Sequence, residues 1–100
     1  MENKLVSIGV PVFNGQKYLK KTLKNLIDQT YKNIEIIISD NHSTDDTEKI
    51  CKKFANQDDR IKYFRQKRSI DVNENFNFTL SKATGHYFMW NAVDDLRSTD

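Results

Sequence analysis

The chain has 100 residues, the size of one small domain with a modest hydrophobic core. Sixteen lysines and arginines against fourteen aspartates and glutamates give a net charge of +2, too small an excess to indicate nucleic-acid binding. The single cysteine, Cys51, excludes an internal disulfide and favours a reducing compartment. No apolar run reaches the roughly 20 residues of a transmembrane helix, and the polar N-terminus is unlike a signal peptide. We therefore expect a cytoplasmic protein, with the inner face of the membrane as a second location.

The hydrophobic pattern predicts alternating strands and helices. Strands are expected at residues 5–13, 34–39, 61–64 and 86–91, and amphipathic helices at residues 16–29, 43–55 and 73–84. The second strand is apolar almost throughout, which is typical of a strand buried on both faces. The helical spacing of Cys51 with Ile50 and Phe54 predicts a core position for the thiol. The order β-α-β-α-β-α-β indicates a mainly parallel sheet with right-handed crossovers, an α/β, Rossmann-like three-layer sandwich.

The helix ends carry their own sequence patterns. Ser43 and Asp46 have the spacing of a capping box at the start of the second helix. Gly85 is expected to cap the third helix. One side of that third helix is predicted to be apolar, through Phe76, Leu80 and Ala83.

Polar side chains follow three of the four predicted strands. Asn14 follows the first strand, Asp40 and Asn41 follow the second, and Asp94 and Asp95 follow the fourth. In a parallel sheet these positions meet at one edge, where ligands of open α/β sheets bind. Asp40 has two interpretations, a carboxylate that holds ribose hydroxyls or a cap of the next helix.

Asp94 and Asp95 come shortly after the apolar run at residues 87–90. Paired carboxylates suit a hard divalent cation that also binds phosphate, although two solvated loop acids are the alternative. Lys67 and Arg68 stand in a loop where they would assist a phosphate or simply face solvent, and His42 is read as an exposed polar residue. The sequence holds no P-loop, no G-x-G-x-x-G, no nucleophile elbow and no Cys/His zinc cluster.

Four segments together resemble the family 2 glycosyltransferases, which have a GT-A fold. They are VSIGVPVFN at 6–14, DQTY at 28–31, IIISDNHSTD at 36–45, and ATGHYFMW at 83–90 followed by Asp94 and Asp95. The segments occur in the family's order and span nearly the whole chain. Ala92 stands where the family's D-x-D pattern usually has its leading acid.

The resemblance implies a role for each matching position. Pro11, Val12, Phe13 and Asn14 would lie beside the nucleotide base, and Asp40 would contact the uracil or ribose. Asn41 replaces the family's usual second acid, which implies a changed nucleotide preference. Asn77 matches an asparagine near the nucleotide pocket, Asp94 would approach the ribose, and Asp95 would bind Mn²⁺ or Mg²⁺.

The implied activity is transfer of a sugar from a nucleotide diphosphate to a hydroxyl of a saccharide or lipid-linked acceptor, in polysaccharide or glycoconjugate synthesis. Similar enzymes continue well past the acidic pair, into an acceptor-binding half that carries the general base. We therefore expect residues 1–100 to be the nucleotide-sugar-binding half of a truncated GT-A domain, with the catalytic general base beyond Asp100. The full-length enzyme is expected to associate peripherally with a membrane.

Two other functions fit parts of the pattern. A non-catalytic GT-A-like domain that acts as a binding module is the main alternative, favoured by the short chain and by Ala92. A phosphoacceptor receiver domain also groups acids at strand ends, but it would need them after the first strand, where this chain has Asn14 and Gly15.

Overall fold

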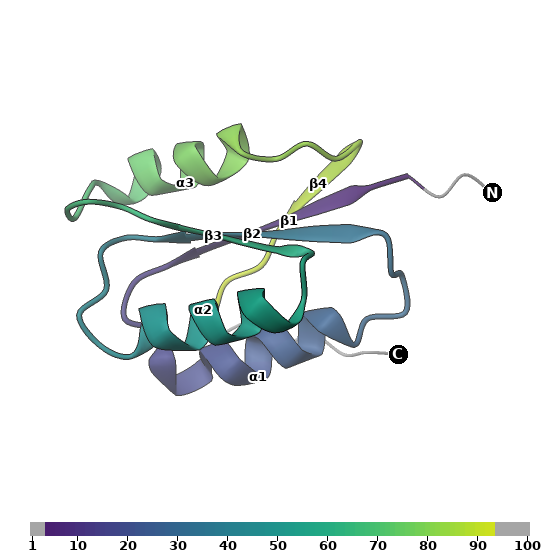
Figure 1. Ribbon diagram of the computed structural model, residues 1–100. Helices are drawn as coiled ribbons and strands as arrows, with labels where there is room; N and C mark the ends of the chain where they lie inside the picture. The colour runs from purple at the N-terminus through teal and green to yellow at the C-terminus, as the bar shows by residue number, and fades with distance from the viewer. Residues whose placement is uncertain (1–3, 94–100) are drawn as a thin grey trace.

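The computed structural model describes residues 4–93 and folds as a three-layer α/β sandwich (Figure 1). Strands and helices alternate along the chain, as predicted. The elements are β1 (Val6–Val12), α1 (Gln16–Ile27), β2 (Ile34–Asp40), α2 (Thr47–Gln57), β3 (Ile61–Arg65), α3 (Val72–Ser81) and β4 (Tyr87–Trp90).

The four strands form one sheet in the order β3-β2-β1-β4, and every neighbouring pair is parallel. Helices α1 and α2 cover one face of this sheet, and α3 covers the other (Figure 1). The predicted parallel sheet is therefore confirmed. All four strands end toward the same edge, which is the requirement for the predicted site.

The core lies between the sheet and the α1–α2 layer. Alternate residues of β1 and β2 point into it, including Val10, Ile36 and Ile38, which are fully buried. Leu23 of α1 and Cys51 of α2 meet them from the helix side, so the predicted core position of Cys51 is confirmed. Burial of each such aliphatic side chain contributes about 1.5–3 kcal/mol. All seven residues of β2 are buried, as its apolar run predicted.

The prediction of an apolar inner face on α3 is wrong. Phe76 and Leu80 are 39% and 48% exposed, whereas Asn75 and Thr79 are buried against the sheet. The reason is the sheet surface beneath α3. There a Cβ on Gly9 would lie 3.0 Å from the Thr79 methyl, so the helix approaches closely through small and polar side chains.

The predicted helix caps are also corrected. Helix α3 ends at Ser81 with Lys82 as its C-cap, and Gly85 does not have a positive φ. Gly85 is required instead by a close backbone approach, because a Cβ there would lie 2.8 Å from the Leu5 carbonyl oxygen. Asp46, not Ser43, is the N-cap residue of α2, and it makes no side-chain capping bond. Ser43 is used elsewhere, in the loop described next.

Candidate functional site

The site begins at the carboxyl edge of the sheet, where three strand ends lie side by side. Val12 at the end of β1 pairs with Asp40 of β2, and Asp40 pairs with Arg65 of β3. The backbone N–H of Asn41 continues this alignment by donating to the Val12 carbonyl oxygen at 2.8 Å. The predicted meeting of Asn14, Asp40 and Asn41 at one edge is thus confirmed.

Asp40 is fully buried, and both of its carboxylate oxygens have partners. Oδ1 accepts hydrogen bonds from the Ser43 backbone N–H at 2.9 Å and from the Ser43 hydroxyl at 2.6 Å. Oδ2 accepts a 2.6 Å hydrogen bond from the Tyr63 hydroxyl. Burial and the bond to Asp40 raise the pKa of Tyr63, so this hydroxyl stays protonated and donating. Asp40 therefore holds the loop after β2 in place.

Asn14 joins the loop after β1 to the loop after β2. Its backbone N–H donates to the Ser43 hydroxyl at 2.8 Å, and its side-chain Oδ1 accepts from the Thr44 N–H at 2.8 Å. Asn14 and His42 both have positive φ, 48° and 57°, a conformation that most side chains avoid. These reciprocal hydrogen bonds hold Asn14 in that conformation and connect the two loops across the strand ends.

Asn41 connects the same edge to the loop after β3. Its Nδ2 donates to the Ile70 carbonyl oxygen at 2.8 Å, and its Oδ1 accepts from the Ile70 N–H at 2.7 Å. The Nδ1 of His42 lies 3.0 Å from the Gln66 carbonyl oxygen. His42 is partly buried, so its prediction as an exposed residue is wrong. The amide at position 41 is satisfied by the protein backbone at both of its polar atoms.

Between this edge and α3 lies a small cavity of about 160 Å³. Its lining includes four of the residues predicted to bind nucleotide, namely Pro11, Val12, Phe13 and Asn41, together with Val72, Asn75 and Phe76 of the opposite wall. Phe13 is 56% exposed, so an aromatic face stands open at the cavity. Aromatic faces stack on nucleobases, with about 1–3 kcal/mol per base.

Asn75, rather than Asn77, is the asparagine of α3 that faces this cavity. Asn75 is buried, accepts from the Ser39 hydroxyl at 2.6 Å and donates to the Ser39 carbonyl oxygen at 3.1 Å. Asn77 is exposed and does not line the cavity. Two positions along a helix differ by about 200°, which places the two side chains on opposite sides of α3.

Three of the predicted positions lie outside the described residues. They are the acidic pair, Asp94 and Asp95, and Asp100, the residue beyond which the general base is expected. The roles of the pair in ribose and metal binding, and the place of the general base, therefore stay predictions. Within residues 4–93 no group of three His, Cys, Asp or Glu side chains is arranged to hold a metal.

The described chain approaches the acidic pair through two contacts with β1 and its turn. The backbone N–H of Asn91 donates to the Gly9 carbonyl oxygen at 2.9 Å. Val93, the last described residue, lies against the turn after β1, because a Cβ on Gly15 would be 2.9 Å from its Cγ1. The hydroxyl of Thr22 in α1 donates to the Val93 carbonyl oxygen. The segment that leads to the pair is thus fixed beside the end of β1.

Arg65 links β3 to the loop after β2. It donates to the Ser43 carbonyl oxygen at 2.9 Å, and its Nε lies 3.9 Å from Asp40 and 3.7 Å from Glu48. Lys67 and Arg68, the predicted loop cations, are exposed. They line a shallow hollow of about 610 Å³ beside β3, separate from the cavity at Phe13.

Sequence reasoning missed Tyr63, Arg65 and Asn75 as parts of this edge. Tyr63 and Arg65 alternate along a short strand, as ordinary strand residues do. Asn75 was missed because the spacing of the apolar residues in α3 predicted a different inner face. One signal was available in the sequence. Asn75 stands one turn before Thr79, on a helix that must cover Gly9 and Ser39, and that spacing would have indicated a polar inner face.

A parallel α/β sheet with connected loops and an open cavity at its carboxyl edge is the class of α/β domain whose ligands bind at that edge. The family model for glycosyl transferase family 2 matches residues 7–100. The chain belongs to that family.

Two relatives illustrate the similarity. The glycosyltransferase GlyG of Streptococcus pneumoniae serotype 4 is 36% identical over 94 residues, which are 94% of this chain and 31% of GlyG. A GalNAc(5)-diNAcBac-PP-undecaprenol beta-1,3-glucosyltransferase of Campylobacter jejuni is 40% identical over 91 residues, which are 90% of this chain and 29% of that enzyme. The chain thus spans about a third of the length of these relatives.

Solved structures agree on the fold, which is that of GT-A glycosyltransferases. A mannosyltransferase from Pyrobaculum calidifontis, in complex with GDP-mannose and Mn²⁺, superposes with a TM-score of 0.85 at 21% identity, over 94% of this chain and 28% of its own. TarS from S. aureus, residues 1–349 with UDP-GlcNAc, gives a TM-score of 0.81 at 26% identity, over 91% of this chain and 26% of its own.

Proposed function

We propose that residues 1–100 form the nucleotide-sugar-binding part of a glycosyltransferase that moves a sugar from a nucleotide diphosphate to an acceptor hydroxyl. The observation that carries this proposal is the cavity at the carboxyl edge, which Pro11, Val12, Phe13 and Asn41 line in a chain of family 2. The base would stack on Phe13 and enter the cavity between the edge and α3. The complex of TarS with UDP-GlcNAc supports a uridine nucleotide as the first ligand to test.

In this proposal the loop residues divide into two roles. Asn14 and Asn41 border the nucleotide, whereas buried Asp40 keeps the Ser43 loop in the shape that the nucleotide meets. Asp94 would approach the ribose, and Asp95 would hold Mn²⁺ or Mg²⁺. The bound ion would offset the negative charge that develops on the leaving diphosphate. Oxygen donors at Asp95 suit either ion.

The acceptor in this proposal is a saccharide or a lipid-linked saccharide. The name of the Campylobacter relative, which refers to an undecaprenol-linked acceptor, supports the second class. A lipid-linked acceptor would keep the longer enzyme at a membrane surface, at its cytoplasmic face. The general base that deprotonates the acceptor hydroxyl would come from the part of that enzyme beyond Asp100. No helix within the described part of the chain is both long enough and apolar enough to cross a bilayer.

Calorimetric titration of the 100-residue chain with UDP tests the nucleotide and metal roles. We expect binding in Mn²⁺ or Mg²⁺, at least tenfold weaker binding without a divalent ion, and the same loss in Asp95→Ala. Asp59→Ala is the matched control, because Asp59 is an exposed acid between α2 and β3, before the amino end of that strand and so at the opposite edge of the sheet. Equal binding with and without metal would contradict the role of Asp95. Nucleotide binding without sugar transfer by the longer enzyme would favour the non-catalytic binding module instead.

A further inference from the structure

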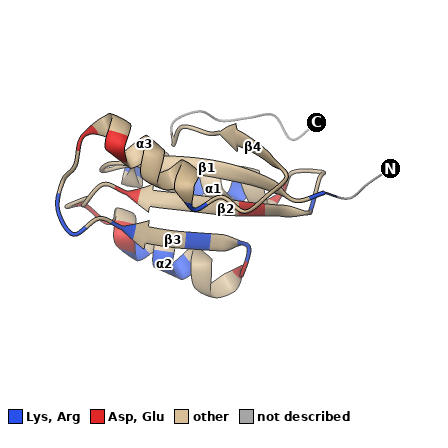
Figure 2. Cartoon of the chain, turned by 90° about the horizontal axis from the view of Figure 1, so that it is seen from above, with Lys and Arg blue, Asp and Glu red and all other residues tan. Residues whose placement is uncertain are grey.

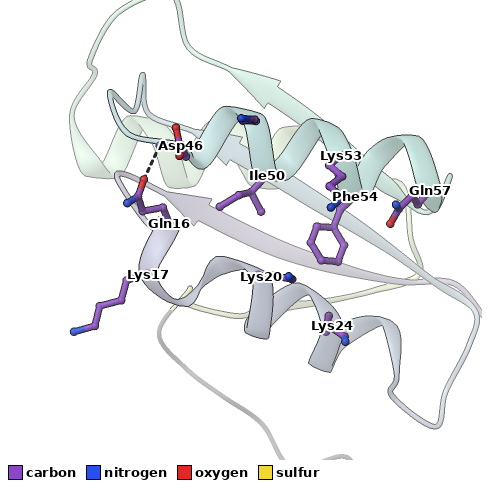
Figure 3. Close-up of a pocket in the computed structure, with 10 residues that line it drawn as sticks. Gln16, Lys17, Lys20, Lys24, Asp46, Ile50, Lys53, Phe54 and Gln57 are labelled. Atoms are coloured by element: carbon purple, nitrogen blue, oxygen red, sulfur yellow. Dashed lines mark hydrogen bonds between the residues drawn. The ribbon is translucent and has the colours of Figure 1, made fainter.

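The outer surface of α1 and α2 carries a further hollow, on the opposite face of the sheet from α3 and the cavity at Phe13. It is about 970 Å³ in volume and runs between the two helices (Figure 3). Ile50 and Phe54 project from α2 into it and give it an apolar floor. Five lysines line it, which are Lys17, Lys20, Lys24, Lys49 and Lys53. We call this surface the lysine groove.

Positive charge is concentrated on this layer. Helices α1 and α2 together hold seven lysines and one glutamate, a net charge of +6, whereas the whole chain has +2. All other residues together therefore carry −4. Figure 2 shows lysine segments on both helices, on the far side of the sheet from α3. The small net charge of the whole chain therefore does not reveal the strongly basic face that α1 and α2 form.

Acidic side chains of the described residues do not balance the charges of the groove lysines. No salt bridge between described residues joins any of the five to an acid. Asp46 is the one acidic residue in the groove lining, and it stands at one end, where its N–H is bonded to Gln16. The Lys17 ammonium lies 5.3 Å from the centroid of the Tyr18 ring, a contact that leaves its charge in place. All five lysines therefore present a positive charge to an anionic partner.

Spacing within each helix gives the groove its shape. Lys17, Lys20 and Lys24 are three and four residues apart on α1, and Lys49 and Lys53 are four apart on α2, so each set lies on one helix face. The two helices contact each other within one layer. The two stripes together make a broad surface of ammonium groups with apolar side chains between them. Long lysine side chains over an apolar floor suit the boundary between lipid headgroups and acyl chains.

We propose that the lysine groove binds the headgroups of anionic phospholipids and lays the chain on a membrane surface. A nucleic acid is the weaker match, because Phe54 is half-buried in the floor and does not offer a free ring for base stacking. One end of the groove reaches the site, since Gln16 and Asp46 are bonded only two residues from Asn14 and three from Ser43. A membrane-borne acceptor would then lie beside the carboxyl edge of the sheet. The position of the acceptor rests on the proposed function, whereas the binding of the lysine groove to lipid does not.

Vesicle flotation with the 100-residue chain tests this surface directly. Vesicles of phosphatidylcholine with 30% phosphatidylglycerol are compared with pure phosphatidylcholine at ~0.1 M salt. We expect binding only to the anionic vesicles. Each lysine near an anionic membrane surface strengthens binding. The triple variant K20Q/K24Q/K53Q, which loses three of them, should therefore bind on the order of a hundredfold more weakly. The matched control, K32Q/K62Q/K82Q, removes the same charge elsewhere on exposed positions and should bind within threefold of wild type.

Circular dichroism and thermal melting test whether both variants are folded. Equal losses in the two triple variants would overturn the assignment of the groove, and so would binding to neutral vesicles or no binding to anionic vesicles. Lysine-dependent binding to a single-stranded RNA with no binding to vesicles would overturn the membrane partner. Titration with UDP and Mn²⁺ separates this proposal from the function proposed above, because K20Q/K24Q/K53Q should bind the nucleotide like wild type.

Discussion

The Tyr63 hydroxyl donates a 2.6 Å hydrogen bond to Oδ2 of Asp40, and this bond joins β3 to the site. From Asp40 the connection continues through Oδ1 to the hydroxyl of Ser43, which in turn accepts from the N–H of Asn14. One chain of hydrogen bonds thus crosses the ends of β3, β2 and β1. A tyrosine that never reaches the cavity lining therefore fixes the loops that do.

Tyr63→Phe removes one donor and leaves a buried carboxylate oxygen without its partner. We expect the free energy of unfolding to fall by about 1–3 kcal/mol and UDP to bind several-fold more weakly, because the Ser43 loop loses its support. Urea unfolding and calorimetric titration measure the two effects. Tyr18→Phe on exposed α1 is the control and should change neither quantity. Full stability in Tyr63→Phe would show that the bond contributes nothing.

Asn75 and Asn77 form a matched pair on one helix. Asn75→Ala breaks two hydrogen bonds to buried Ser39 and should lower the free energy of unfolding by about 1–3 kcal/mol. It should also weaken UDP binding, because Asn75 lines the cavity. Asn77→Ala on the exposed side should leave stability within about 0.5 kcal/mol of wild type. A larger effect at Asn77 than at Asn75 would reverse the assignment of the α3 inner face.

The sequence was sufficient for most of the fold because strands and helices here follow their hydrophobic periods. The apolar run at residues 34–39 became the fully buried β2, and the spacing of Leu19, Leu23 and Leu26 became the inner face of α1. The same reasoning predicted the wrong inner face for α3, because the sheet residues under that helix are small and polar. Asn75 and Thr79 therefore pack inward, while Phe76 and Leu80 stay exposed.

Part of the site was predictable for a similar reason. Parallel strands end at one edge, so Asn14, Asp40 and Asn41 were expected to meet there. What each side chain contacts was not predictable, because those partners lie far along the chain. Tyr63 is 23 residues from Asp40, and Ile70 is 29 residues from Asn41. The sequence alone does not show which distant hydroxyl or peptide group will form a hydrogen bond with a buried polar group.

The thiol of Cys51 should be inert in the native chain. Burial, with the nearby charges of Asp40 and Asp45, raises its pKa to about 12, so almost none is thiolate at pH 8. We expect an aromatic disulfide reagent to react at least a hundredfold more slowly with the native chain than with the urea-unfolded chain. The rate should rise with urea in parallel with unfolding measured by circular dichroism. Rapid labelling of the folded chain at pH 8 would contradict the buried position.

Glu35 gives the fold a pH dependence. Its burial would raise the carboxyl pKa, but hydrogen bonds from Ser7 and Thr84 outweigh burial and hold the pKa below the ordinary 4.5. Because the folded value is the lower one, the carboxylate stabilises the fold above pH 4.5, and that contribution is lost as pH falls through the folded pKa. Glu35→Gln should therefore cost about 1–2 kcal/mol at pH 7, and this difference should shrink below pH 4.5. Urea unfolding of both chains from pH 3 to pH 7 measures it, with exposed Glu74→Gln as control. A difference that stays constant across this range would show that the charge of Glu35 contributes no net stability.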